Sequence, residues 1–180
     1  GRPGLRCQAG QRWQWDGVDF ELLHPRAEDY AAPGKPNALS CVLRVQAAHG
    51  ASALLAGDIE AAQEAELARR APTALRADVL LAPHHGSRTS SSAALLAAVQ
   101  PRWALIQAGW RNRFGHPAPD VVARYQARGI RLADSPSCGA MHWSSARPSK
   151  VQCERLQVHR YWWHLPSAAQ ELNPASEGVR

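Results

Sequence analysis

Hydrophobic and polar residues alternate over residues 11–25, which is the pattern of a half-buried β-hairpin. Asp16-Gly17 lies at the centre of this segment and is a common two-residue hairpin turn. A strand over 40–45 and an apolar run over 53–56, separated by turn residues, predict a second hairpin. Residues 26–37 between the hairpins are rich in proline, glycine and charge, so we expect a loop there.

Beyond residue 58 the pattern changes to helices that alternate with apolar strands. Residues 59–70 combine strong helix formers with acidic residues at the start and Arg69-Arg70 at the end, which suits the helix dipole. Nearly uninterrupted apolar runs over 78–82 and 103–108 are typical of buried strands. The same reasoning predicts helices over 93–99 and 119–128 and a strand over 130–133. It also predicts a last hairpin formed by 138–144 and 151–158. This alternation predicts a layered α/β fold.

The length of 180 residues suits one domain of ordinary size. We expect that domain over residues 1–165, followed by a polar, frayed tail over residues 166–180. No apolar run approaches the roughly 18 residues that a membrane span needs. Residues 1–10 also lack the apolar centre of a signal peptide. Any export signal or membrane anchor is therefore expected elsewhere, on a larger parent chain.

The chain is basic, with 21 lysines and arginines against 15 acidic residues and a net charge of +6. Only Lys35 and Lys150 are lysines. Arginine forks suit two-point contacts with phosphate, so the charge favours a polyanionic partner. The codon usage of a GC-rich genome explains the same arginine excess equally well. Charge therefore permits a nucleic-acid partner without specifying one.

Three groups of polar residues follow apolar runs, namely Gly57-Asp58, the segment 84–87 and the segment 112–116. Ligands of α/β proteins bind beyond the carboxyl ends of strands, so the three groups are expected at one edge. Aspartate and histidine are also ligands of divalent metals. Asp58 could instead cap the following helix, and His116 could be a turn residue. The other histidines lack a partner pattern and are interpreted as structural or surface residues: His24, His49, His142, His159 and His164.

The segments LLAGDIE, DVLLAPHHGSRTSSS and AGWRNRFGHP, in this order and spacing, resemble the metallo-β-lactamase domain of the ComEC family of DNA-uptake channel proteins. The similarity covers residues 7–143, where WQWDGVDFELLHP also matches the lead-in found in that family. The resemblance implies the second half of a four-layer αββα sandwich. Such a domain has mixed sheets with flanking helices and a dinuclear metal site at one edge.

The resemblance also implies roles for particular residues. Asp58 matches an aspartate that bridges two metal ions, and His84 matches a late histidine ligand, with His85 as its neighbour. Asn112 and His116 match a loop that reaches the same edge. The catalytic set is therefore Asp58, His84, His85 and His116, of which Asp58 and His84 bind metal. Phosphate contacts are expected from hydroxyl, amide and guanidinium groups near the site: Ser87, Thr89, Ser90, Arg111, Asn112 and Arg113.

The His-x-His-x-Asp-His signature of the family does not occur in the chain. In the family it lies in the preceding half of the domain, so we expect this chain to carry about half of the ligands. The resemblance implies two divalent ions, zinc or manganese, which the chain alone binds weakly or not at all. With both halves present, the implied reaction is metal-assisted hydrolysis of DNA, which degrades the strand that does not enter the cell. His116 or His85 would protonate the leaving oxygen.

Two other interpretations remain open. One is a hydrolase on the same fold that acts on a thioester, a lactone or a small phosphoester. The other is a non-catalytic module that binds DNA or supports the uptake channel. The arginine-rich segment 111–114 favours a phosphate substrate over the other small esters. The upstream coding sequence separates an enzyme from a binding module, because only an enzyme requires the missing histidine motif.

The four cysteines are Cys7, Cys41, Cys138 and Cys153, and none forms a Cys-x-x-Cys pair. They could be two disulfides or four buried thiols. The resemblance implies a location on the periplasmic or extracellular side of the inner membrane, where disulfides persist. Together with the positions of the cysteines beside the two outer hairpins, this favours Cys7–Cys41 and Cys138–Cys153. The partners implied are DNA and the rest of the channel with its oligonucleotide-binding domain, with membrane contact only through the parent chain.

Overall fold

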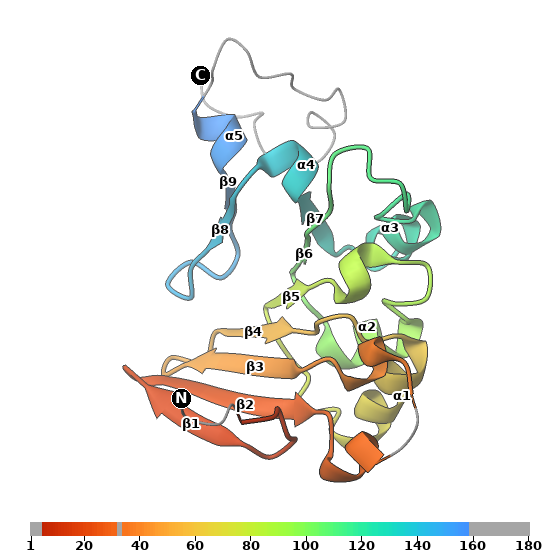
Figure 1. The fold of residues 1–180 in the computed structure, drawn as a ribbon. Helices are drawn as coiled ribbons and strands as arrows, with labels where there is room; N and C mark the ends of the chain where they lie inside the picture. Colours follow the sequence, from red (N-terminus) through yellow and green to blue (C-terminus); the bar gives the residue numbers. More distant parts are fainter. Residues whose placement is uncertain (1–4, 32–33, 159–180) are drawn as a thin grey trace.

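A computed structural model describes residues 5–31 and 34–158 (Figure 1). The tail expected over residues 166–180, and the interpretation of His159 and His164, lie outside the described residues. Among the helices that the structure describes, none has the length and apolar character required to cross a membrane.

Seven strands form one mixed sheet in which spatial order follows chain order. The first four strands pair antiparallel, and β4 to β7 pair in parallel. Their bounds are β1 (Arg12–Trp15), β2 (Val18–His24), β3 (Val42–Ala47), β4 (Ser52–Leu55), β5 (Val79–Leu81), β6 (Trp103–Ile106) and β7 (Arg131–Asp134). Both predicted hairpins are confirmed, and Asp16 and Gly17 have the positive φ angles of the expected turn, 54° and 75°.

Helices cover one face of this sheet, and a small second sheet lies on the other face (Figure 1). The helices are α1 (Ala61–Arg70), α2 (Ala93–Val99) and α3 (Pro119–Gln126). The second sheet pairs β8 (Met141–Trp143) with β9 (Val151–Cys153) and is flanked by α4 (Ser135–Cys138) and α5 (Glu154–Gln157). The α/β class is therefore confirmed. The last hairpin has a shorter second arm than predicted, because the chain turns into α5 after Cys153.

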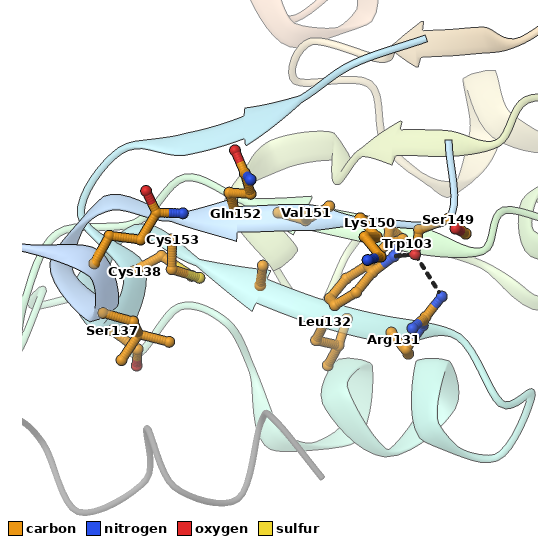
Figure 2. Close-up of a pocket in the computed structure, with 13 residues that line it drawn as sticks. Trp103, Arg131, Leu132, Ser137, Cys138, Ser149, Lys150, Val151, Gln152 and Cys153 are labelled. Carbon is orange, nitrogen blue, oxygen red and sulfur yellow. Dashed lines mark hydrogen bonds between the residues drawn. A yellow bond between two sulfur atoms is a disulfide. The ribbon is translucent and has the colours of Figure 1, made fainter. Parts of the chain in front are cut away.

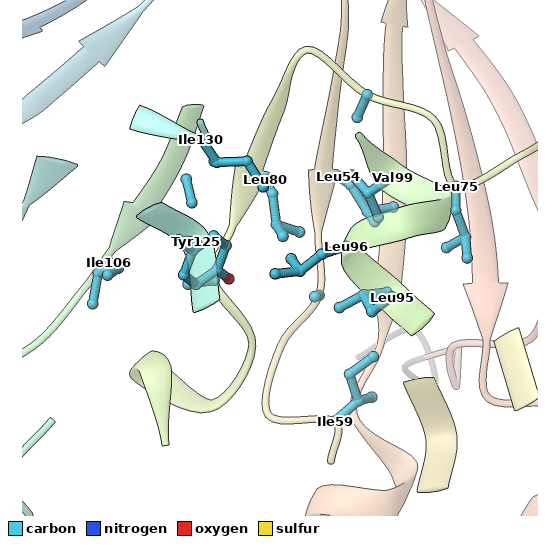
Figure 3. Close-up of a cluster of buried hydrophobic side chains, with 14 of the residues drawn as sticks. Leu54, Ile59, Leu75, Leu80, Leu95, Leu96, Val99, Ile106, Tyr125 and Ile130 are labelled. Atoms are coloured by element: carbon cyan, nitrogen blue, oxygen red, sulfur yellow. The ribbon is translucent and has the colours of Figure 1, made fainter. Parts of the chain in front are cut away.

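The main core lies between the parallel strands and the three helices (Figure 3). Leu54 and Leu80 point from adjacent strands toward the helices and are fully buried. Burial of a leucine side chain contributes roughly 1.5–3 kcal/mol. The helices add fully buried side chains to the same cluster: Leu67, Leu95, Leu96, Val121 and Tyr125. This core fixes the strands whose ends carry the candidate site.

A buried carboxylate joins α1 to the start of α2. Glu64 has no exposed surface, and its two oxygens accept hydrogen bonds from the backbone N–H groups of Ser91 and Ser92, each at 2.6 Å. The hydroxyl groups of Ser91 and Tyr125 are 2.9 Å apart. Burial raises the pKa of Glu64, and the hydrogen bonds from the serines oppose that rise. The segment before α2, which borders the candidate site, is therefore tied to the core.

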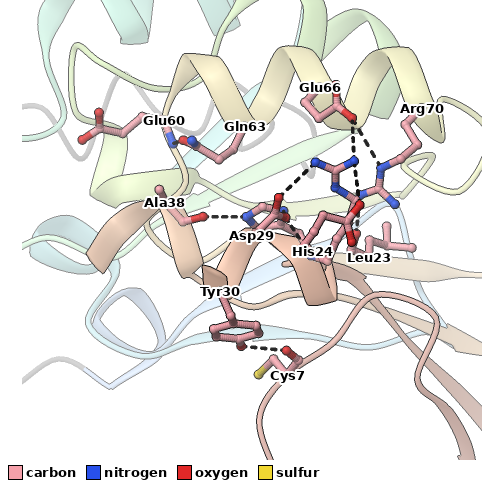
Figure 4. A network of polar contacts seen from close by, with 12 residues as sticks. Cys7, Leu23, His24, Asp29, Tyr30, Ala38, Glu60, Gln63, Glu66 and Arg70 are labelled. Carbon is pink, nitrogen blue, oxygen red and sulfur yellow. Dashed lines mark hydrogen bonds and ion pairs between the residues drawn. The ribbon is translucent and has the colours of Figure 1, made fainter. Parts of the chain in front are cut away.

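The loop expected over residues 26–37 contains two short 3-10 helices, η1 (Ala27–Ala31) and η2 (Pro36–Leu39). Polar contacts tie both to the end of β2 (Figure 4). The Nε2 atom of His24 bonds to the Ala38 carbonyl at 2.8 Å, and Nδ1 lies 3.7 Å from the Asp29 carboxylate. Buried His24 is thus a structural residue, as its sequence context suggested.

One disulfide lies near each end of the described chain. Cys7 is bonded to Cys41 with a Cα–Cα distance of 5.9 Å, and Cys138 to Cys153 with 4.4 Å. These are the two pairings that the sequence analysis favoured. The Tyr30 hydroxyl also donates to the Cys7 carbonyl at 2.7 Å (Figure 4). The N-terminal segment is therefore held against β3 by a covalent bond and against η1 by a hydrogen bond.

Candidate functional site

The polar groups that follow β4, β5 and β6 meet at one edge of the sheet. The Asp58 carboxylate lies 3.5 Å from Nε2 of His85, and the ring centroids of His84 and His85 are 6.5 Å apart. The ring centroid of His116 is 6.0 Å from that of His84. Because the three strands are parallel neighbours, their carboxyl ends share this edge. The structure thus brings together Asp58 and the three histidines that the sequence singled out.

Both histidines after β5 have an unusual backbone conformation. His84 and His85 have φ angles of 49° and 56°, in the left-handed region that non-glycine residues seldom occupy. The segment forms η3 (Pro83–Gly86), in which the His84 N–H donates to the Gly57 carbonyl at 2.9 Å. Such conformations persist only where surrounding contacts hold them, and they cluster at functional sites. The backbone conformation of these two histidines is therefore a further indication that this edge is a functional site.

Gly86 packs this turn against the loop that carries His116. Its φ angle is +77°, and a Cβ placed there would lie 2.8 Å from the Cβ of Pro117. The Ala118 N–H donates to the Gly86 carbonyl at 2.9 Å. Only glycine combines this backbone conformation with so close an approach. The relative positions of the His84-His85 pair and His116 are thereby fixed.

His85 is oriented in a way that leaves one ring nitrogen available to a ligand. Its Nδ1 lies 2.8 Å from the Gln107 carbonyl, which can only accept, so Nδ1 carries the proton. In the neutral ring Nε2 therefore has a lone pair, and this atom faces Asp58. A histidine held through a backbone carbonyl in this way is the usual arrangement of a metal ligand. About half of the His85 side chain is exposed.

His84 has a different environment from its neighbour. Its Nδ1 lies 3.5 Å from Glu60 and 3.4 Å from the Thr89 hydroxyl. Its Nε2 lies 3.4 Å from the Asn37 amide. Sequence reasoning missed Asn37 and Glu60 as site residues. The only signal for Glu60 was its position two residues after Asp58, and Asn37 comes from a distant loop.

Asp58 does not cap α1, which was the alternative to a site role. The N-cap is Glu60, whose side chain forms a reciprocal capping box with Gln63. The Glu60 backbone N–H donates to the Gln63 side chain at 3.3 Å (Figure 4). Asp58 therefore lies before the helix, with its carboxylate toward His85.

His116 is partly buried beside the other two histidines. Burial lowers the pKa of His116, and the nearby His84 and His85 lower it further. Both effects favour the neutral form of the ring. Its buried Nδ1 has no hydrogen-bond partner in the described part of the chain. The aromatic ring of Phe114 stacks against it at 5.7 Å, with an angle of 17° between the planes.

The three hydroxyl residues expected to contact phosphate differ in their accessibility. Thr89 is exposed, and its hydroxyl lies 3.2 Å from that of Ser87, which is largely buried. Ser90 is only 2% exposed, and its hydroxyl lies 2.8 Å from the Pro83 carbonyl. Ser90 therefore does not reach the surface, because its hydroxyl donates within the turn. The Ser90 hydroxyl supports η3 instead, which corrects the expectation that Ser90 contacts phosphate.

The loop between β6 and α3 presents arginines and aromatic rings, and Asn112 braces it. The Asn112 amide nitrogen donates to the Gly109 carbonyl at 3.0 Å and to the His116 carbonyl at 2.6 Å. Its oxygen accepts from the His116 N–H at 3.0 Å. Asn112 therefore holds the loop in shape. Arg111 and Arg113 are exposed, and among the described residues neither forms an ion pair with a carboxylate.

The edge does not by itself form a complete metal site. Within residues 5–31 and 34–158, no group of three or more histidine, cysteine, aspartate or glutamate side chains is placed to hold one ion. The donors that do approach each other come in pairs, Asp58 with His85 and Glu60 with His84, each at 3.5 Å. A metal ion at this edge would therefore need donors beyond those that the described residues bring together.

Two cavities differ in the chemistry of their linings. One, of about 470 Å³, opens at the candidate site and is lined by His85, Gln107, Ala108, Gly109, Asn112, Phe114, His116 and Ser135. The other, of about 360 Å³, lies between β7 and β9, where Arg131 and Trp103 both contact the Ser149 carbonyl (Figure 2). Its described lining contains no histidine or carboxylate. Of these two cavities, the first is therefore the one whose lining offers imidazole groups for acid–base chemistry.

The fold and this edge define an α/β protein with polar residues gathered at the carboxyl ends of its parallel strands. No family model matches the chain. The chain is 41% identical over 160 residues to Competence protein ComA of Neisseria gonorrhoeae, covering 89% of this chain and 22% of that protein. It is 40% identical over 118 residues to Recombination protein 2 of Haemophilus influenzae, covering 66% and 14%.

ComE operon protein 3 of Bacillus subtilis is 34% identical over 126 residues, which cover 70% of this chain and 16% of that protein. The chain is therefore related to a segment of the competence proteins of the ComEC family. It spans between 14% and 22% of the length of these relatives. A resemblance to this family was expected from the sequence motifs, and the relatedness is confirmed.

Proposed function

We propose that the chain carries the second half of a metallo-β-lactamase-fold nuclease domain that acts in DNA uptake. The observation that carries this proposal is that Asp58 faces His85 and that His85 and His116 line one cavity at the sheet edge, in a chain related to competence proteins. The substrate is a DNA phosphodiester, and the strand that does not enter the cell is degraded. Two divalent ions, zinc or manganese, are the proposed cofactors.

The face of the main sheet opposite the helices supports the four-layer sandwich. Cross-strand pairs place a row of apolar side chains on that face, from Phe20 and Val45 to Leu43, Leu55 and Leu81, beside the part that the β8–β9 sheet already covers. All of them retain exposed surface. A second sheet packing on such a face would cover these residues. We propose that the segment preceding this one in the longer relatives supplies that sheet.

The available donors suit a divalent ion shared between the two halves. Asp58 and the Nε2 atom of His85 would hold it from this side, because Nδ1 of His85 is already engaged by Gln107. The sequence favoured His84 as the ligand, but both of its ring nitrogens face Asn37, Glu60 and Thr89. We therefore assign the ligand role to His85 and a supporting role to His84. A bound divalent ion supplies Lewis-acid activation of water and of the phosphate.

The remaining residues have roles that do not depend on the ion. His116 lies at the site with a lowered pKa, so its neutral ring can accept a proton and, once charged, would readily pass that proton to the leaving oxygen. Thr89, in the loop before α2, faces the same edge, and its hydroxyl can bond to a phosphate oxygen. Exposed Arg111 and Arg113 can hold flanking phosphates through their forked N–H groups. Asn112 braces the backbone of the loop that carries both arginines and His116.

A location outside the cytoplasmic membrane and further partners are part of the same proposal. The two disulfides suit the oxidising periplasmic or extracellular side. The proposed partners are DNA and the rest of the uptake channel, including its oligonucleotide-binding domain. The incomplete donor set favours one alternative, in which the domain binds DNA or supports the channel without catalysis.

Salt dependence of DNA hydrolysis by the complete uptake protein tests the phosphate role. Replacing Arg111 and Arg113 together with alanine should raise KM and reduce its dependence on salt, with kcat little changed. The reason is that a guanidinium holding a flanking phosphate does so in both the ground and transition states. Arg128→Ala is a control, since that exposed arginine lies at the end of α3, away from the loop. An unchanged salt slope in the double variant would remove the phosphate role.

A further inference from the structure

The loop at residues 109–116 exposes two aromatic rings beside the candidate site. Trp110 is 55% exposed and Phe114 is 66% exposed. Large aromatic side chains are normally buried, and rings at the rim of a charged site are a common sign of binding. Phe114 also lines the cavity of about 470 Å³ that His85 and His116 share. Its volume falls in the range of about 300–1,000 Å³ that is usual for ligand sites.

Each ring is paired with an arginine that has no acidic partner in the described part of the chain. The guanidinium carbon of Arg111 lies 5.6 Å from the ring centroid of Trp110, and that of Arg113 lies 4.8 Å from Phe114. The loop therefore repeats one unit twice, a flat ring next to a cation. Such surface cation–π pairs are weak and readily exchanged for other partners. A nucleotide could replace both contacts, with its base on the ring and its phosphate on the guanidinium.

We propose that Trp110 and Phe114 stack on unpaired bases, so that the site takes a single nucleic-acid strand in preference to a duplex. Bases of a duplex are stacked on each other and cannot reach these rings without unpairing. The ring of Phe114 continues into the stack with His116, which leads from the bound base toward the candidate site. The proposal deepens the proposed function, on which it rests for the identity of the substrate.

The backbone of the loop that carries the two rings is braced by hydrogen bonds, which favours stacking over a chance exposure. Asn112 lies midway between the rings and uses both ends of its amide to brace the loop against Gly109 and His116. A loop that is already ordered loses little conformational entropy on binding, so more of the stacking free energy contributes to affinity. The geometry therefore points to a preformed binding loop.

The test is binding of a labelled oligo-dT strand and of a matched duplex to the 180-residue chain, measured by fluorescence anisotropy in EDTA. Binding without divalent ions keeps this result separate from failure of the nuclease proposal. We expect tighter binding to the single strand. The Trp110→Ala, Phe114→Ala double variant should lose at least about tenfold in affinity for that strand. Its affinity for the duplex should change little.

Three controls make the result specific to stacking. Trp15→Ala removes an even more exposed ring, 74% exposed, in the first hairpin and should leave binding unchanged. Trp110→Phe with Phe114→Tyr keeps the rings and should restore binding. An abasic strand of the same charge should bind the wild-type chain as weakly as the ordinary strand binds the double alanine variant. Equal losses on single strand and duplex, no loss, or absence of any binding would each overturn the proposal.

Discussion

In the longer protein to which we propose this chain belongs, Asp58→Ala and His85→Ala should each reduce DNA hydrolysis at least about 100-fold. Both side chains are proposed to hold the ion that activates water, and loss of groups that only orient metal ligands already costs about 10- to 100-fold. The reason is local geometry. The Asp58 carboxylate and the Nε2 atom of His85 are 3.5 Å apart, and the Gln107 carbonyl fixes the His85 ring. His84→Ala should have a smaller effect, because the ring nitrogens of His84 face Glu60, Asn37 and Thr89.

Single-turnover hydrolysis of a labelled strand distinguishes these variants from each other. His142→Ala is a matched control, since that exposed histidine belongs to β8 of the second sheet and its ring faces Glu154. We expect the wild-type rate from this control. A large loss in His84→Ala together with full activity in His85→Ala would contradict the assignment of the ligand role. That result would instead assign the ligand role to His84, which the sequence resemblance favoured.

The substitution Glu64→Ala should lower the free energy of unfolding of the chain by about 3 kcal/mol, because it leaves two buried N–H groups without an acceptor. Both belong to the segment before α2, at Ser91 and Ser92. Chemical denaturation at pH 7 measures this loss. Glu66→Ala in the same helix is the control, since its ion pairs with Arg69 and Arg26 lie at the surface and should contribute much less.

The pH dependence of stability gives Glu64 a second signature. Burial raises the pKa of its carboxyl in the folded chain above the value in the unfolded chain. The folded state therefore binds the proton more tightly, and this contribution to stability is fully present below the unfolded pKa. It is lost as pH rises through the folded pKa. Glu64→Gln should remove that part of the pH dependence. An Ala variant as stable as wild type would contradict the structural role.

Periodicity and turn residues were sufficient to predict most of the fold. The hairpin turn at Asp16-Gly17 depends on a local preference for positive φ angles, and the apolar run before Pro83 could only be a buried strand. Local signals of this kind need no knowledge of distant contacts. The short α5 was missed because the run over 151–158 has no pattern long enough to separate a strand from a single helical turn.

The candidate site was predictable only as far as strand ends determine it. Asp58 and His85 follow neighbouring parallel strands, so their meeting follows from topology. The choice between His84 and His85 depends on two left-handed residues and on the Gln107 carbonyl, which no local pattern reveals. Glu64 looked like one of several charged residues in a helix. Its partners lie 27 and 28 residues further along the chain, so its burial could not be foreseen.

Metal titration tests most directly the central claim that this chain carries one half of a shared metal site. Isothermal calorimetry with Mn²⁺ or Zn²⁺ should show weak or no binding to the 180-residue chain, because Asp58 and His85 alone cannot saturate two ions. The complete protein should bind two ions tightly, and Asp58→Ala should abolish that tight binding. Two tight sites on the isolated chain, or none on the complete protein, would contradict the account.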